Sequence, residues 1–469
     1  MDTETVPAEK AGKKFQNPLT EGPILKGLLI IALPIILSNL LQNVLELVDM
    51  YFIGQLGDDC IAAGTTSASV IMVLMAIMFG VNTAGAAFVS RAFGSKKFER
   101  IRVIIGHLFY VGIIFGIIFA FIGVFFTEQL FQLIGADPAV VAEGVKFLRP
   151  VLIGSIILIL LMLLTTVFQS TGDSRTPMFV MIIVNVINIV LNPTLIQGLW
   201  IFEPMGIAGS AYASLISRAI GLILLILAMY FLPSKRNGPL KFPKKWTFEP
   251  RLLRDIIFVG IPSAIQSGIR AGAFLGMTVV ITSYGTAAMA AYGICGRLDM
   301  LGYILVMGLC TGVAVMVGQN LGNNKPDRAK KVAKYAILIN AAFMLIVGIL
   351  YLLFATNLLE LFGATAESLE AGTLFMQIVP FSYFIIAAAM TMGFAMNGAG
   401  KTLPGMIAAL SGQLIVQVGL SALFAYLGFP LQTIWFCIFG SAFVVFGVDL
   451  FFFLRGSWLH KKLNLGGEA

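Results

Sequence analysis

Charged side chains are scarce in this sequence. Only 12% of its 469 residues are Asp, Glu, Lys or Arg, whereas an average soluble domain carries roughly 25%. Hydrophobic residues make up 58% of the chain, and the mean hydropathy is +0.94. The scarcity of charge therefore excludes an ordinary soluble protein and predicts an integral membrane protein.

Cysteine and histidine are also rare, which limits the chemistry that the chain can carry. None of the four cysteines has metal-ligand spacing, and His107 and His460 lie far apart. No GxxxxGK[ST] motif and no nucleophile–base motif occurs, so we expect neither direct use of ATP nor enzymatic activity. We accordingly predict no catalytic residue, no cofactor and no metal centre.

Long apolar runs dominate what remains. A membrane-spanning helix needs about 20 apolar residues, and on that criterion the chain divides into about twelve spans. The predicted fold is an all-α membrane protein with spans near 27–54, 60–90, 103–126, 140–170, 177–198, 206–232, 252–283, 286–318, 330–356, 366–397, 404–427 and 431–455.

The connections between these spans alternate in charge. Basic clusters follow even-numbered spans, as at 91–102, 235–254 and 325–331. Acidic residues gather after odd-numbered spans: Asp58, Asp59, Glu128, Asp137, Glu143, Glu203, Glu360, Glu367 and Glu370. By the positive-inside rule both termini are cytoplasmic, and we expect a multi-pass protein of the plasma membrane. Because the net charge of +8 is sorted by membrane side, we expect no nucleic-acid partner.

The two halves of the chain repeat each other at an offset of 228 positions. Pro34 matches Pro262, Gly94 matches Gly322, and GADPAVVAEG from Gly135 matches GATAESLEAG. An even number of spans per half predicts a parallel repeat about an axis along the membrane normal. The predicted parts are a leader (1–26), a first six-helix lobe (27–232), a basic linker (233–251), a second six-helix lobe (252–455) and a cytoplasmic tail (456–469).

Two acids interrupt the apolar run of the first span. Glu46 and Asp49 are three positions apart and therefore share one helix face. A charged residue at the centre of a span costs ~2.5–3.5 kcal/mol, so such residues face a bundle interior or a wet cavity. We predict that this carboxylate pair titrates as a unit and couples transport to an ion. The alternative is that each acid pairs with a buried arginine, such as Arg218 or Arg270.

Further polar residues lie within later spans. Asn188 and Asn192 recur at helical spacing, where they can bind the first-span acids or cargo, or only connect helices. In the second half, the polar group consists of Gln266, Arg270, Arg297 and Asp299. Arg297 and Asp299 point to different helix faces, and we expect structural ion pairing there rather than a second ion site. Asp449, in the last span, is expected to pair with basic loops.

The chain resembles the multidrug and toxic compound extrusion (MATE) family. The resemblance is carried by LVDMYFIGQLG (47–57), GAAFVSRAFGSKKFERIR (85–102), TGDSRTP (171–177), NVINIVLNP (185–193), GIAGSAYAS (206–214), AYGICGRLDM (291–300) and VGQNLGNNKPDRA (317–329). It covers nearly all of residues 24–455, and the second half is similar to the DNA-damage-inducible or archaeal branch. It implies a cation-coupled antiporter with two six-helix lobes around a central cleft.

The resemblance also implies roles for individual residues. Asp49 matches an aspartate used for ion coupling, and Gln42 and Asn188 match polar residues of the pocket. The sequence departs from the family pattern where Asn192 and Arg270 stand in place of acids. Glu46 stands where asparagine is expected, so the second acid has moved onto the first span.

The resemblance, together with the acids of the first span, implies an exporter of organic, cationic or amphipathic compounds that acts by alternating access. Protons are the expected coupling ion, with sodium bound at Asp49 as the alternative. The second hypothesis is a flippase for lipid-linked precursors, or a metabolite exporter of the same superfamily, because Arg270 and Arg297 can bind a phosphate. A channel or structural protein is the third. We expect a monomer whose partners are the lipid bilayer and small organic cargo.

Overall fold

The computed structural model describes residues 17–199, 202–231 and 247–466. Throughout these ranges the regular structure is helical, with no strand. In the part of the chain that the structure describes, eleven helices are long and apolar enough to cross a membrane, and the count is twelve when one bent pair is taken as a single span. The predicted all-α membrane fold is therefore confirmed.

The first lobe contains the helices up to Phe231. They are α1 (Pro18–Glu21), α2 (Ile24–Gly54), α3 (Asp58–Gly94), α4 (Phe98–Phe125), α5 (Thr127–Ile134), α6 (Pro138–Ile153), α7 (Ser155–Ser170), α8 (Arg175–Gln197) and α9 (Ile207–Phe231). Helices α6 and α7 meet at a bend of 50°. The bend follows Pro150, which cannot donate a backbone hydrogen bond and commonly kinks a helix.

The second lobe follows the same order. It comprises α10 (Pro250–Thr282), α11 (Thr286–Gly322), α12 (Pro326–Leu353), α13 (Ala355–Leu361), α14 (Ala366–Ile378), η1 (Val379–Ser382), α15 (Tyr383–Gly398), α16 (Leu403–Ala408), η2 (Ala409–Leu420), α17 (Ser421–Tyr426) and α18 (Leu431–Leu454). Two of its spans contain irregular turns: a 3₁₀ turn at η1, which contains Pro380, and a π-helix at η2.

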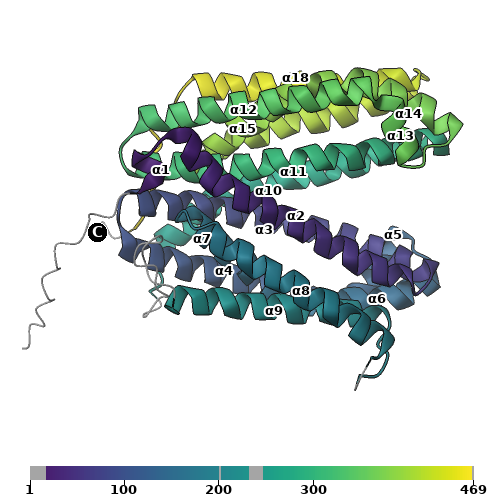
Figure 1. The fold of residues 1–469 in the computed structure, drawn as a ribbon, viewed down its shortest axis with the longest axis horizontal. Coiled ribbons are helices and arrows are strands. Elements are labelled where there is room, and N and C mark those ends of the chain that lie inside the picture. The colour runs from purple at the N-terminus through teal and green to yellow at the C-terminus, as the bar shows by residue number, and fades with distance from the viewer. Residues whose placement is uncertain (1–16, 200–201, 232–246, 467–469) are drawn as a thin grey trace, which may run out of the picture.

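The first helix of each lobe crosses to the other lobe. The opening turns of α2 bury Leu28 and Ile31 in the hydrophobic core of the second lobe, beside Met316. In the same way α10 buries Leu252 and Ile256 in the core of the first lobe. Figure 1 shows α2 running from the second lobe at one end of the molecule to the first lobe at the other.

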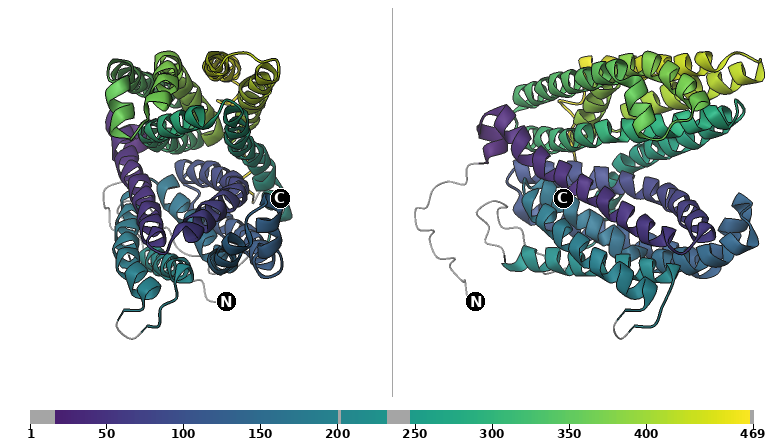
Figure 2. Two further views of the ribbon diagram at one scale, coloured as in Figure 1. Left: turned by 90° about the vertical axis from the view of Figure 1, so that its right-hand side faces the viewer. Right: turned by 45° about the vertical axis from the view of Figure 1, so that its right-hand side comes forward.

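The lobes touch at one end of the molecule and separate at the other. Figures 1 and 2 show them in contact near α1 and diverging toward α5 and α13. Glycines allow the close approach, because a β-carbon at Gly80 would overlap with the Gly260 carbonyl oxygen and one at Gly308 with Ile36. Farther along α10, a β-carbon added at Gly268 or Gly272 would have no atom of a neighbouring segment within 4 Å. The contacting end carries the basic loops, and the diverging end carries the acidic ones.

The first and the last described segments of the chain pack where the lobes touch. Leu19, near the end of the predicted leader, is buried in the core of the second lobe. In the predicted tail, Trp458 is buried in the second lobe and Leu465 packs into the core of the first. Most of the predicted linker, residues 233–246, lies outside the described residues.

Candidate ion and cargo sites

Asp49 lies near the end of α2, with its carboxylate directed at α8 and α9. Its Oδ1 accepts hydrogen bonds from Asn192 Nδ2 at 2.6 Å and from Asn188 Nδ2 at 3.2 Å. Its Oδ2 accepts one from Ser214 Oγ at 2.6 Å. Both asparagines are fully buried, whereas Asp49 is half-buried. The second half of α2 thus places its carboxylate at a polar site inside the first lobe.

The side chains around Asp49 form a connected network. Asn188 Nδ2 also donates to Ser214 Oγ at 3.1 Å, and Asn192 Nδ2 donates to Asn188 Oδ1 at 2.9 Å. Three donors reach the Asp49 carboxylate, and within the described ranges no basic side chain forms an ion pair with it. Asn192 Oδ1 is buried without a hydrogen-bond partner in the described structure. It is a free acceptor beside Asp49, available to a carboxylic acid proton or to a hard cation.

Glu46 lies in different surroundings from Asp49. It is exposed, and its Oε1 accepts a hydrogen bond from Gln42 Nε2 at 3.1 Å, one turn back along α2. Glu46 and Asp49 share no hydrogen bond, and within the described ranges neither acid forms an ion pair with an arginine. The two acids therefore lie near each other on α2 but contact different groups.

Sequence reasoning missed Ser214 as a member of this network. Its hydroxyl comes from α9, within the small-residue run GIAGSAYAS that opens this helix. Small residues let α8 and α9 approach closely, which brings Ser214 within reach of Asn188. Ser214 lies on a different helix from the predicted asparagines. It could have been predicted only by assuming that α9 packs against α8.

The second lobe encloses a cavity of about 500 Å³. Its polar lining includes Gln266 and Arg270 from α10, Asp299 from α11 and Asp449 from α18. Its aromatic wall is formed by Phe274, Tyr292, Tyr303, Phe375, Tyr383 and Phe394. The π-helix η2 contributes Gln413 and Gln417, and π-helical turns are frequent at functional sites.

The charged groups of this cavity are arranged differently from the sequence expectation. Asp299 accepts a hydrogen bond from the Tyr383 hydroxyl, so its partner is a tyrosine rather than an arginine. Arg297 is exposed and has no hydrogen bond or ion pair with any described residue. The expectation for Asp449 was wrong, since this acid lines the cavity, and within the described ranges no ion pair joins it to a basic loop.

Several acceptors at this cavity have no partner. Gln266 Oε1, Gln413 Oε1 and Asp449 Oδ1 are buried without a hydrogen bond in the described structure. Buried polar atoms are normally paired, so unpaired acceptors beside a cavity indicate space for a ligand that donates hydrogen bonds. Among the described residues no group of three or more His, Cys, Asp and Glu side chains could hold a metal ion.

Known proteins resemble this chain over most of its length. The family model described as MatE matches residues 34–194 and 262–441. The probable multidrug resistance protein YoeA of Bacillus subtilis is 29% identical over 375 residues, which cover 79% of this chain and 80% of the relative. The FAD transporter of Shewanella oneidensis is 26% identical over 422 residues, or 88% of this chain and 91% of that protein.

The fold is shared with a solved structure. A MOP superfamily transporter from Pyrococcus furiosus superposes with a TM-score of 0.86, covering 97% of this chain and 100% of that chain. The sequence identity is 22%, so this likeness shows the fold alone.

Proposed function

The chain belongs to the MatE family, and on that premise we propose that it is a secondary active exporter of organic compounds, driven by protons through Asp49. Members of this family are membrane transporters of small molecules rather than enzymes. The observation that carries the proposal is the buried network around Asp49, in which a half-buried carboxylate receives three hydrogen bonds and has no ion pair among the described residues.

The hydrogen bonds of Asp49 support the proposal of proton exchange at this residue. In the ionised state the carboxylate is held by Asn188, Asn192 and Ser214. A proton on Asp49 turns one acceptor into a donor, so this network must rearrange, and the free Asn192 Oδ1 offers a new acceptor. Such a change loosens α2 from α8 and α9, and α2 is the helix that crosses between the lobes. Protonation would thereby favour cargo release.

Sodium remains the alternative coupling ion in this proposal. A hard cation prefers oxygen ligands, and Asp49, the Asn192 amide oxygen and the Ser214 hydroxyl can supply them. Glu46, exposed one turn away, would then attract protons or cationic cargo toward Asp49 without itself being held by the network.

We place the cargo in the second-lobe cavity. Unpaired acceptors at Gln266, Gln413 and Asp449 suit a donor-bearing, cationic compound. The aromatic wall suits a flat or amphipathic one, through stacking and cation–π contact. Gln42 and Asn188 were predicted as further cargo contacts, and Asn188 is already engaged by Ser214 and Asp49.

A second candidate, export of an anionic metabolite, is favoured by one observation. Arg270 lines the cavity, and a guanidinium there can bind a phosphate or a carboxylate. The relative from Shewanella oneidensis is named an FAD transporter, and FAD is an anionic metabolite that carries phosphate groups. Arg297 was predicted to bind the diphosphate of a lipid-linked precursor, but it is exposed and does not line the cavity.

The test uses everted membrane vesicles loaded at acid pH and supplied with a fluorescent organic cation outside. Wild-type protein should accumulate the cation when a pH gradient is imposed, and Asp49→Asn should not. Glu46→Gln is the matched control on the same helix, and it should retain gradient-driven uptake with weaker apparent affinity for the cation. A sodium gradient at equal pH distinguishes the two ions. Uptake by Asp49→Asn at the wild-type rate would remove Asp49 from the mechanism.

A further inference from the structure

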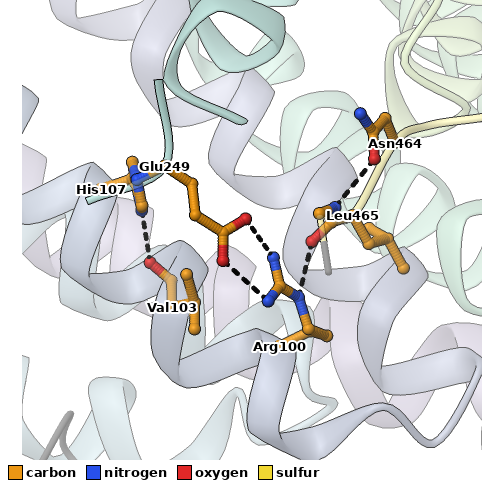
Figure 3. A network of polar contacts seen from close by, with 7 residues as sticks. Arg100, Val103, His107, Glu249, Asn464 and Leu465 are labelled. Carbon is orange, nitrogen blue, oxygen red and sulfur yellow. Dashed lines mark hydrogen bonds and ion pairs between the residues drawn. The ribbon is translucent and has the colours of Figure 1, made fainter. Parts of the chain in front are cut away.

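An arginine of the first lobe binds the chain that leads into the second. Arg100, in the first turn of α4, donates to both carboxylate oxygens of Glu249, at 2.9 and 2.6 Å. Glu249 immediately precedes α10, and its backbone N–H donates to His107 Nε2 at 2.9 Å. Arg100 Nε also donates to the Leu465 carbonyl oxygen in the tail, at 2.8 Å. Figure 3 shows Arg100 between these two segments of the second half.

The second lobe makes the corresponding contact in reverse. Arg328, in the first turn of α12, donates to the carbonyl oxygen of Gly22, in the segment that leads into α2. Arg328 lies 228 positions after Arg100, which is the offset of the internal repeat, and Glu249 lies 228 positions after Glu21. Nearby, Lys325 Nζ donates to the Thr20 carbonyl oxygen at 3.2 Å. Each lobe therefore holds the entry to the other lobe's first helix.

The ends of α3 and α11, which precede the helices of these arginines, also pack on each other reciprocally. A β-carbon at Gly94 would overlap with the Gln319 carbonyl oxygen, and one at Gly322 would overlap with the Arg91 carbonyl oxygen. The backbones of the two lobes thus meet at matching positions, with each glycine allowing the approach. The two contacts are related by the same offset of 228 positions, since Gly322 matches Gly94 and Gln319 matches Arg91.

The first-lobe half of this arrangement has an additional attachment. Arg91 Nη2 donates to the Lys461 carbonyl oxygen at 2.6 Å, and Leu465 is buried in the first-lobe core. The tail follows the last helix of the second lobe, so these contacts join the lobes again at the same end. None of these residues lines the second-lobe cavity or contacts Asp49.

We propose that Arg100 and Arg328 are positioning residues of the transport cycle, which together form a two-part clasp that holds the lobes closed at the basic end. The clasp is made only while the lobes touch there, so it stabilises this conformation and not the one in which that end opens. Hydrogen bonds to a charged group or from one are among the stronger polar contacts in proteins. Opening the basic end to receive cargo must break both arginine contacts. The proposal rests on alternating access in the proposed function.

The test measures the distance between spin labels at Lys96 and Lys330, which are exposed on opposite lobes at the basic end. Arg100→Gln and Arg328→Gln should each shift the ratio of separated to closed populations roughly tenfold toward separated, and the two together should shift it further. The matched control is Arg102→Gln, because Arg102 pairs with Glu99 of its own helix at 2.8 Å. It should leave the distribution unchanged.

Two variants separate the clasp from a folding defect. Arg100→Lys keeps the charge but loses the two-point contact, so it should give an intermediate shift in a folded protein. The charge exchange Arg100→Glu with Glu249→Arg should recover part of the closed population, which a local packing defect would not do. Unchanged distances in folded Arg100→Gln and Arg328→Gln, or a shift in only one of them, would overturn the proposal. The distances need no ion gradient or cargo, so this outcome is independent of whether Asp49 couples transport.

Discussion

At the scale of single residues, neighbours rather than residue type distinguish the two acids of α2. Asp49 and Glu46 are one turn apart and chemically alike, yet Asp49 is bound by three buried donors and Glu46 by a single partly exposed glutamine, Gln42. The sequence predicted both acids from their rarity in an apolar span. It could not predict that they contact different groups, because that depends on how α8 and α9 pack against α2.

The Ser214 hydroxyl provides a residue-scale test of the network. Ser214→Ala removes a 2.6 Å hydrogen bond to Asp49 and an acceptor for Asn188, so it should weaken ion-driven uptake and lower stability by about 1–3 kcal/mol. Ser210→Ala is the control, because Ser210 lies one turn away on α9 and its buried hydroxyl has no partner among the described residues. Uptake assays and thermal unfolding in detergent measure both effects. Equal behaviour of the two variants would exclude a role for Ser214.

The ion pair at Glu249 predicts a pH dependence outside the membrane. The hydrogen bonds from Arg100 hold the pKa of Glu249 below its ordinary value of 4.5, and His107 is the other titratable group facing it. Since the folded pKa is lowered, the stabilisation is fully present above about pH 4.5 and is lost as the pH falls through the folded value. The difference in unfolding temperature between wild type and Glu249→Gln should therefore be constant from neutral to mildly acid pH and shrink below it. A difference that peaks in acid would contradict this.

At the scale of helices, the sequence predicted the elements better than their contacts. The predicted spans agree with the helices because each is a long apolar run bounded by glycine, proline or charge, as at Gly54 and Pro250. The crossing of α2 and α10 into the opposite lobes was not predictable, since the apolar residues of α2 do not reveal which apolar surface they cover. The same limit applies to Asp449, whose position in the last span looked close to the loops although its side chain enters the cavity.

The close contact of α3 with α10 can be tested with alanine. A β-carbon at Gly80 would overlap with the Gly260 carbonyl oxygen, so Gly80→Ala should separate these helices and cost about 1–3 kcal/mol. Gly268→Ala on α10 is the control, because nothing lies within 4 Å of the added carbon. That change should be neutral or stabilising by up to ~1 kcal/mol through helix propensity. A lower unfolding temperature for Gly268→Ala than for Gly80→Ala would contradict the close contact of α3 with α10.

At the scale of the whole molecule, the charge of the loops differs between the end where the lobes touch and the end where they diverge. The end where the lobes touch carries the basic loops, and the end where they diverge carries the acidic ones. The positive-inside rule predicts that the closed end faces the cytoplasm and that this conformation opens to the outside. The repeat visible in the sequence predicted two lobes, and its offset recurs in the reciprocal contacts of Gly94 and Gly322.

Labelling of engineered cysteines tests this orientation. Asp137→Cys and Glu367→Cys, both exposed at the acidic end, should react with a membrane-impermeant maleimide in intact cells. Lys96→Cys and Lys330→Cys at the basic end should react only after the membrane is permeabilised. The four native cysteines are buried, so they should give little background. The reverse pattern would invert the molecule in the membrane.

Proton release on cargo binding tests the central claim, exchange of an ion for cargo at Asp49, most directly. Purified protein in weakly buffered solution is mixed with an organic cation, and released protons are counted with a pH indicator while binding is measured separately. Wild type should release protons as the cation binds, because the proposed exchange at Asp49 links cargo binding to the loss of a proton. Asp49→Asn should bind the cation and release none. Absence of release from wild type, or undiminished release from Asp49→Asn, would contradict the account.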